Sequence, residues 1–196
     1  MYSKIYNIKL SENHLKILSL FTRGFNRGYY IREVHKLMGV SPRTAQIILE
    51  DLKSKGVIES ETKGKIKVYH IKKSETAKDY LILTEQYKKI VFLSSYRVIR
   101  EIIEKILPYI HGIALIFGSY AKYKAKEDSD LDILIVGSCD YDKIEKIAKL
   151  YGIEVQIKGY PFEIFKKNIS SDYLIKEVLK DHIVITGVEK FIRVII

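Results

Sequence analysis

Two short stretches in the second half of the chain carry residue types whose spacing suits phosphate and metal chemistry. The apolar run Ile113–Phe117 leads straight into Gly118 and Ser119, where backbone N–H groups and a hydroxyl can hold a phosphate at the start of a helix. Asp130 and Asp132 then open a second apolar run. Side chains two residues apart on a strand point to the same face, so these carboxylates repel each other unless a cation neutralises them. Oxygen-only ligands favour Mg²⁺ or Mn²⁺, which also bind nucleotide phosphates.

The elements around these residues follow an alternating pattern. Asp132 is embedded among Leu, Ile and Val residues, where an unpaired carboxylate is costly, so a ligand or partner is expected for it. The apolar periodicity predicts strands at 113–117, 131–136, 152–158 and 182–186, and helices at 140–150, 162–168 and 171–180. This order predicts an α/β layer with a mixed sheet.

The stretch from Gly118 to Ala121, followed by Ser129 to Asp132, resembles the signature of the DNA polymerase beta nucleotidyltransferase superfamily, in particular its minimal nucleotidyltransferases. The resemblance covers residues 109–186. It implies that Gly118 and Ser119 bind the triphosphate of an NTP, with ATP as first choice, and that Asp130 and Asp132 bind two Mg²⁺ or Mn²⁺ ions. An NMP would then pass to a protein or other acceptor, with release of pyrophosphate.

Members of this superfamily complete the site with a third carboxylate on a neighbouring strand, which acts as base or metal ligand. The strand at 152–158 is the candidate, and there Glu154 and Gln156 share a face. Glu154 is the only carboxylate available, so it is assigned as the third catalytic residue and metal ligand. If Gln156 occupies the corresponding position, the third carboxylate is lost. A second departure is Tyr123, because the branch often has glycine two residues after the alanine of its Gly-Ser-x-Ala segment.

The charge of the chain is concentrated in its first half. The 196 residues carry a formal net charge of +10, and residues 1–95 hold 18 Lys and Arg against 9 Asp and Glu. A basic half of this kind attracts polyphosphate, most simply nucleic acid, although a lysine-rich solvated surface gives the same count.

Composition also excludes several classes of protein. Cys139 is the only cysteine, which rules out an internal disulfide and a Cys-rich zinc site. No apolar run approaches the roughly 18 residues that cross a bilayer, and Met1–Leu10 has no apolar segment of a secretory signal. The expected location is the cytoplasm, with no membrane partner.

The first half is predicted to fold as three helices followed by a hairpin. Helices are expected at 11–21, 30–37 and 41–55, the last beginning at Ser41-Pro42, with Ile47, Ile48 and Leu52 buried. Strands at 57–61 and 65–71 flank the turn Thr62-Lys63-Gly64. This order resembles MarR- and ArsR-like winged helix-turn-helix domains, which place the third helix in the major groove of double-stranded DNA.

The resemblance implies a set of DNA-binding residues on the third helix and on the hairpin. A winged helix that binds protein instead of DNA has the same pattern, but the lysines of the hairpin favour DNA. The residues assigned to DNA are Ser41, Arg43, Thr44, Gln46, Lys53, Lys63, Lys65 and Lys67.

A helical connector joins the two halves. Residues 75–107 have apolar residues at near-helical spacing, with a break near Ser94-Ser95 and a stop at Pro108. Its apolar stripe either forms a homodimer or packs on its own chain. The predicted fold class is therefore α+β, with a winged helix-turn-helix domain at 1–73, a connector at 74–108 and a nucleotidyltransferase domain at 109–196.

Two functions fit this organisation. The first is a metal-dependent nucleotidyltransferase coupled to a DNA-binding module. The second is a DNA-binding transcriptional regulator whose nucleotidyltransferase fold senses a nucleotide or is inactive. The resemblance also implies a partner, because minimal nucleotidyltransferases often act as antitoxins that modify a HEPN-type ribonuclease. No HEPN segment is evident in the chain, so such a toxin would be a separate protein.

Overall fold

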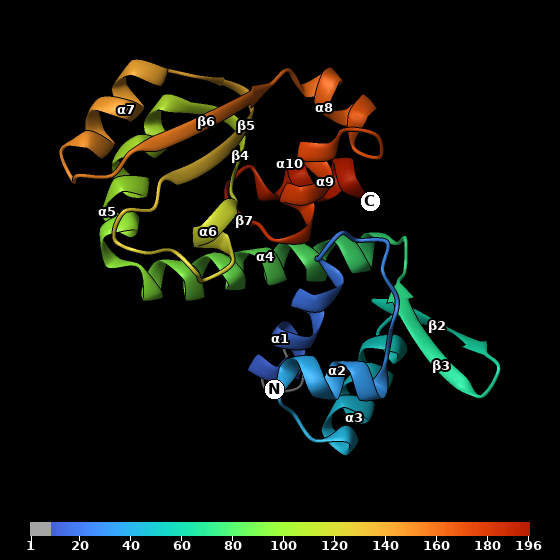
Figure 1. Cartoon of the computed structure of the whole chain (residues 1–196). Helices are drawn as coiled ribbons and strands as arrows, with labels where there is room; N and C mark the ends of the chain where they lie inside the picture. Colours follow the sequence, from blue (N-terminus) through green and yellow to red (C-terminus); the bar gives the residue numbers. More distant parts are fainter. Residues whose placement is uncertain (1–8) are drawn as a thin grey trace, which may run out of the picture.

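The computed structural model of the chain describes residues 9–196. Residues 1–8 lie outside the described residues. They belong to the predicted domain at 1–73, and they make up most of Met1–Leu10, the segment in which no secretory signal is expected. The N-terminal module, residues 9–73, contains α1 (Glu12–Phe21), β1 (Tyr29–Tyr30), α2 (Ile31–Met38), α3 (Pro42–Ser54), β2 (Ile58–Lys63) and β3 (Ile66–Ile71). Figure 1 shows the β2–β3 hairpin projecting beside the three helices.

Local signals in the sequence explain these boundaries. The side chain of Ser41 accepts a hydrogen bond from the backbone N–H of Thr44, and Pro42 occupies the first turn of α3. Gly39 ends α2 in the left-handed conformation, with φ +66°. β3 lies between β1 and β2 in an antiparallel three-stranded sheet.

Two predictions about this module are wrong. Ile47 is 53% exposed, whereas Ala45, Ile48, Leu49 and Leu52 form the buried face of α3. These four positions are spaced by three or four residues, and Ile47 falls outside that face. The hairpin turn is also displaced from Thr62-Lys63-Gly64. Lys63 pairs with Ile66, so the two turn residues are Gly64 and Lys65, and Gly64 supplies the positive φ of +62°.

A long helix connects the N-terminal module to the rest of the chain. α4 (Glu75–Ser95) has 21 residues, and α5 (Arg97–Ile106) follows after a break at Tyr96. The turn η2 (Leu107–Tyr109) then ends the helical segment at Pro108. α4 contacts α1 on one side and both β7 and α10 on the other (Figure 1). None of the helices within 9–196 combines the length and apolar character that a membrane span requires.

The C-terminal module is built on a four-stranded mixed sheet, as predicted. Its order is β6-β5-β4-β7, with β5 and β6 parallel and the other pairs antiparallel. The strands are β4 (Ile110–Ile116), β5 (Leu131–Cys139), β6 (Val155–Tyr160) and β7 (Ile183–Thr186). The helices are α6 (Gly118–Ala121), α7 (Tyr141–Lys149), α8 (Phe162–Asn168), α9 (Tyr173–Lys180) and α10 (Val188–Ile195), the last of which was not predicted.

The central strands bury side chains on both faces of the sheet. Leu131, Ile133 and Ile135 pack with α5 and α7, while Leu134 and Val136 pack with α9 and α10. This explains the unbroken apolar runs that predict these strands. Asp132 has the parity of Leu134, so it lies on the same face as α9 and α10 but at the end where the strand begins.

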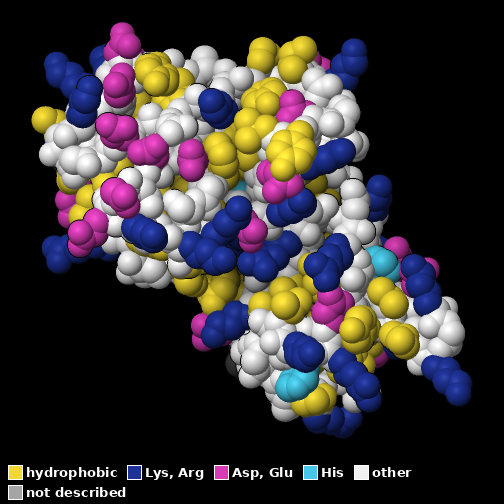
Figure 2. Space-filling model, in the orientation of Figure 1, with side chains coloured by type: hydrophobic (Ala, Val, Ile, Leu, Met, Phe, Trp, Pro, Cys, Tyr) yellow, Lys and Arg dark blue, Asp and Glu magenta, His cyan; other side chains and the backbone are white. Residues whose placement is uncertain are grey.

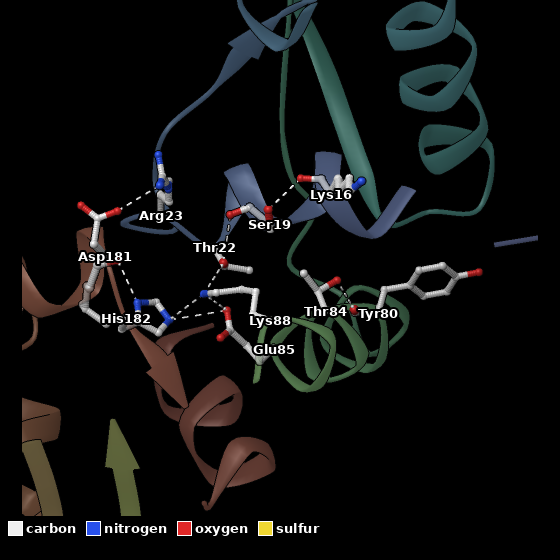
Figure 3. A network of polar contacts seen from close by, with 11 residues as sticks. Lys16, Ser19, Thr22, Arg23, Tyr80, Thr84, Glu85, Lys88, Asp181 and His182 are labelled. Carbon is white, nitrogen blue, oxygen red and sulfur yellow. Dashed lines mark hydrogen bonds and ion pairs between the residues drawn. The ribbon is translucent and has the colours of Figure 1, made fainter. Parts of the chain in front are cut away.

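A buried polar network links the two modules (Figure 3). The Lys88 ammonium group donates to Glu85 Oε1 at 2.8 Å and to Thr22 Oγ1 at 3.1 Å, and His182 Nε2 lies 3.5 Å from Glu85 Oε1. Thr22 belongs to the N-terminal module, Glu85 and Lys88 to α4, and His182 to the segment before β7. Next to this network, Phe25 stacks on His182 at a centroid distance of 5.9 Å and packs edge-on against Phe191 of α10 at 5.8 Å.

Burial and charge act in opposite directions on this network. Burial alone would raise the pKa of Glu85, but the Lys88 ammonium group, together with His182 once it is protonated at low pH, outweighs burial and lowers the pKa to about 2. The pKa of His182 is lowered by burial and by the adjacent Lys88, so this imidazole is neutral at pH 7.

Candidate functional site

Gly118 allows a backbone turn and a close carboxylate approach that no other residue permits. It follows β4, opens the short helix α6, and has φ +69°. A Cβ at this position would lie 3.0 Å from Asp132 Cγ and closer still to Oδ2. The backbone N–H of Phe117 also donates to the backbone oxygen of Asp132 at 3.0 Å. The Gly118 turn and the start of β5 are therefore packed directly against each other, with Ser119 in the first turn of α6.

The two aspartates lie together at this point. The pKa of Asp132 is raised, first by burial and then by the negative charge of Asp130, while Lys158 opposes the shift. A raised pKa means that the ionised form of Asp132 is destabilised where it stands. A divalent cation between the carboxylates would remove this penalty, and the donors are the oxygen atoms that Mg²⁺ and Mn²⁺ prefer.

Gln156, and not Glu154, is the β6 residue beside Asp132. In the parallel β5–β6 pair, Asp132 is level with Gln156, and the Gln156 amide donates to Asp130 Oδ2 at 2.6 Å. Glu154 precedes β6, and its backbone oxygen accepts from the N–H of Leu131. Among residues 9–196, no three His, Cys, Asp or Glu side chains are grouped closely enough to hold a metal ion. The assignment of Glu154 as third metal ligand therefore does not fit the geometry, because the strand register assigns that level to an amide.

Glu154 instead lines a shallow depression at the rim of the site. Its other lining residues are Glu127, Asp128, Ser129, Asp130 and Gly152. Two residues close to the aspartates were not predicted from the sequence to belong to the site. Lys158 is the positive charge that acts on Asp132, and the Tyr120 hydroxyl is affected by the charge of Asp130. Alternation along β6 could have placed Lys158, since it shares the face of Gln156.

Tyr123 has an unusual backbone conformation. Its φ is +55°, in the left-handed region that glycine adopts without strain. This is the position at which the sequence departs from the glycine of the superfamily branch. The turn after α6 therefore has the backbone conformation that glycine adopts most easily, although the residue at this position is a tyrosine.

The residues assigned to DNA binding lie in the N-terminal module, away from the aspartate pair. Arg43 and Gln46 are exposed on α3, with Arg43 Nη1 3.5 Å from Gln46 Oε1. Ser41 caps the same helix and also contacts the Thr44 hydroxyl at 2.8 Å, and Lys53 is exposed at its C-terminal end.

The three lysines of the hairpin differ in their surroundings. Lys65 is exposed in the turn, and Lys63 forms an exposed ion pair with Glu61 at 2.8 Å. Lys67 instead pairs with Glu50 of α3, which also accepts from the Tyr69 hydroxyl. Lys67 is therefore already neutralised within the module, and Lys65 is the lysine most available to an outside phosphate.

The mixed sheet carries the Gly-Ser residues at the end of β4 and the Asp-x-Asp residues at the start of β5. This combination is typical of a nucleotidyltransferase domain. Residues 99–190 match the family model described as "Polymerase beta, Nucleotidyltransferase". A curated relative from Methanocaldococcus jannaschii, named as a protein adenylyltransferase, MJ0604, is 38% identical over 60 residues, which are 29% of this chain. The chain spans 60% of the length of that relative. Residues 99–190 thus form a domain that matches the polymerase beta nucleotidyltransferase family.

Two solved structures are similar at low identity. AF1382 from Archaeoglobus fulgidus is 17% identical, with a TM-score of 0.35 over 46% of this chain and 93% of that one. TrmBL2, an archaeal chromatin protein, is 14% identical, with a TM-score of 0.30 over 89% of this chain and 71% of that one.

Proposed function

We propose that the chain is a metal-dependent nucleotidyltransferase that transfers an NMP, with ATP as the preferred donor, to a protein acceptor. The observation that carries this proposal is the Asp130–Asp132 pair, which lies against the Gly118 turn with the pKa of Asp132 raised by burial and by its neighbour. A bound cation would offset the repulsion between two such carboxylates. The name of the adenylyltransferase relative supports the choice of ATP and of a protein acceptor.

Each residue of the site has a distinct part in this proposal. Asp130 and Asp132 would hold Mg²⁺, which supplies positive charge to the phosphates when bound. Ser119 and the backbone after Gly118 would orient the triphosphate. Gln156 holds Asp130 in place through its amide N–H. An amide takes up no proton, so Gln156 cannot serve as base for the acceptor hydroxyl, and transfer should be slow.

The test combines nucleotide binding with transfer of label. Mg²⁺-dependent ATP binding is measured by calorimetry, and transfer is measured from ATP labelled at the α-phosphate into protein. Asp132→Asn should abolish both, whereas Asp142→Asn, which changes an exposed aspartate on α7, should change neither. If the Asp132→Asn variant binds Mg²⁺-ATP and transfers label as fast as the wild type, the site is wrongly assigned.

Gln156 favours a second candidate function, a regulator that binds a nucleotide without transferring it. In that case the wild type binds Mg²⁺-ATP through Asp130 and Asp132 but transfers no label. Gln156→Asp distinguishes the two functions, because it supplies a carboxylate at the level of Asp132. A slow enzyme should become faster by about tenfold or more, since a positioned base contributes about 10² to 10⁴ in rate. A regulator with no acceptor should remain without transfer.

For the N-terminal module, we infer that it is a winged helix that binds double-stranded DNA. The support is the excess of basic residues in the first half of the chain, together with the exposed Arg43 and Gln46 on α3 and the exposed Lys65 in the hairpin turn. Binding should weaken steeply with salt, because phosphate contacts release counterions. The absence of binding by the folded chain at low salt would leave a protein-binding winged helix.

The remaining partners follow from the connector and from the superfamily resemblance. Leu83, Ile90 and Val98 leave exposed apolar surface on α4 and α5, which suits a homodimer. Ile90→Lys should then shift the mass measured by light scattering from dimer to monomer. A separate HEPN-type toxin is the proposed protein acceptor, which would make the chain an antitoxin, and label transfer to such a protein tests that assignment.

A further inference from the structure

A cavity of about 390 Å³ lies where the two modules meet. Its walls come from α1 and α2 of the N-terminal module, from α4, from the end of α6, and from the segment between α9 and β7. Figure 2 shows Lys and Arg side chains gathered across the middle of this face, between the upper and lower parts of the molecule. The volume falls within the range of about 300 to 1,000 Å³ that is typical of small-molecule sites. None of the residues at the aspartate site lines it.

The lining of this junction cavity carries four cationic side chains. Lys16, Arg23, Lys88 and Lys180 line it, against a single lining carboxylate, Asp181. Arg23 and Lys88 already have carboxylate partners, Asp181 for the first and the buried Glu85 for the second (Figure 3).

The charges left for a ligand are those of Lys16 and Lys180. Lys16 pairs with Glu12, and Lys180 pairs with Glu177, in both cases within one turn of the same helix and open to solvent. Exposed pairs of this kind contribute little to stability, so an incoming anion can replace the carboxylate at small cost.

The lining of the junction cavity also includes apolar and aromatic side chains. Leu37, Val91 and Tyr123 line it and remain 47%, 38% and 49% exposed. The Tyr123 ring packs near Tyr96 and Phe92, at centroid distances of 6.0 and 6.1 Å, which fixes its orientation.

Tyr123 holds this position despite its left-handed φ of +55°. A bulky residue in that region is strained, and such outliers are concentrated at functional sites. The strain is maintained where the ring forms a wall of the cavity, which gives a second and independent reason to expect a ligand there.

We propose that the junction cavity binds a small anion with a flat ring, of the mononucleotide class, at a site separate from the Asp130–Asp132 pair. The ring packs against Tyr123 and Val91, and the phosphate meets Lys180, with Lys16 adding positive charge to the lining. Because these residues come from both modules, the bound ligand adds to the contacts between the modules. The proposal is independent of nucleotidyl transfer, since it requires neither metal nor aspartate.

The test is calorimetric titration of the full chain with AMP in the presence of EDTA. The wild type should bind AMP saturably, and Asp132→Asn should bind it equally well. Lys180→Glu should weaken binding about tenfold or more, a free-energy change of about 1.4 kcal/mol. Lys176→Glu is the matched control, because it changes an exposed lysine on the same helix outside the cavity and should have no effect. Tyr123→Gly should also weaken binding, although it relieves the backbone strain.

Three results would overturn the proposal. The first is the absence of saturable binding without metal. The second is AMP binding that requires Mg²⁺ and is lost in Asp132→Asn, which would assign the nucleotide to the aspartate site. The third is competition by inorganic phosphate or by adenosine alone at the affinity of AMP, which would mean that the cavity does not recognise ring and phosphate together.

Discussion

Replacing Gly118 by alanine, and comparing it with a control glycine, should distinguish the effect on the cation site from the effect on the stability of the fold. The added Cβ would lie 3.0 Å from Asp132 Cγ and inside contact distance of Oδ2, at a residue with φ +69°. The left-handed backbone alone costs an alanine about 1 kcal/mol of unfolding free energy. Overpacking against the carboxylate adds about 1 to 3 kcal/mol unless Asp132 swings away. In the first case the Asp132 carboxylate is strained where it stands, and in the second it leaves its position beside Asp130, so in both cases Mn²⁺ affinity should fall at least about tenfold.

Gly56→Ala is the matched control for the backbone term. Gly56 lies in the N-terminal module, its φ of +72° is almost the same as that of Gly118, and a Cβ there meets nothing within 4 Å. Its unfolding free energy, measured in urea, should drop by about 1 kcal/mol while Mn²⁺ binding, followed by electron paramagnetic resonance, stays at the wild-type level. Equal stability of the two variants together with equal Mn²⁺ affinity would refute the reasoning, because the carboxylate would then have no fixed place against the Gly118 turn.

Further predictions concern the residues proposed to bind DNA and the buried network. Arg43→Ala should reduce discrimination between DNA sequences by about 1 to 3 kcal/mol, and Lys65→Ala should weaken all sequences alike and lower the salt slope by about one, both measured by fluorescence anisotropy. Lys88→Met should lower the unfolding free energy by about 3 to 5 kcal/mol, because it leaves the buried Glu85 carboxylate without its cationic partner. Adding Glu85→Leu to that variant should restore most of the loss. In the wild type, unfolding free energy in urea should decline as the pH falls below about 6.5, the ordinary pKa of histidine, because folded His182 resists protonation. It should decline further from about 4.5 towards 2, as Glu85 becomes protonated. A flat profile over this range would contradict both pKa shifts.

Local chemistry made much of the fold predictable. Ser41-Pro42 and Gly39 fix the ends of two helices through capping and backbone conformation, which depend only on neighbouring residues. The same holds for the Gly118 turn and for the two aspartates at the start of β5.

The third position of the site was not predictable in this way. Glu154 and Gln156 have the same parity in the sequence, and only the start of β6 and its register against β5 decide which one lies beside Asp132. Register depends on the packing of the whole sheet, which the spacing of one segment does not contain. Ile47 was misplaced for a related reason, since the buried face of α3 is chosen by the helices and strands that pack on it.

The contact of Phe25 with His182 and Phe191 has a consequence for how the chain melts. Phe25 belongs to the first module, but its ring is part of the core formed by α9, α10 and β7. A fragment ending after α4 would bring Phe25 and Leu81 into water and leave Glu85 without His182. The two halves look like independent domains in the sequence. They should nevertheless unfold together on heating, in a single cooperative transition. Exchanging either half for a homologous one would require its partner surface to be exchanged as well.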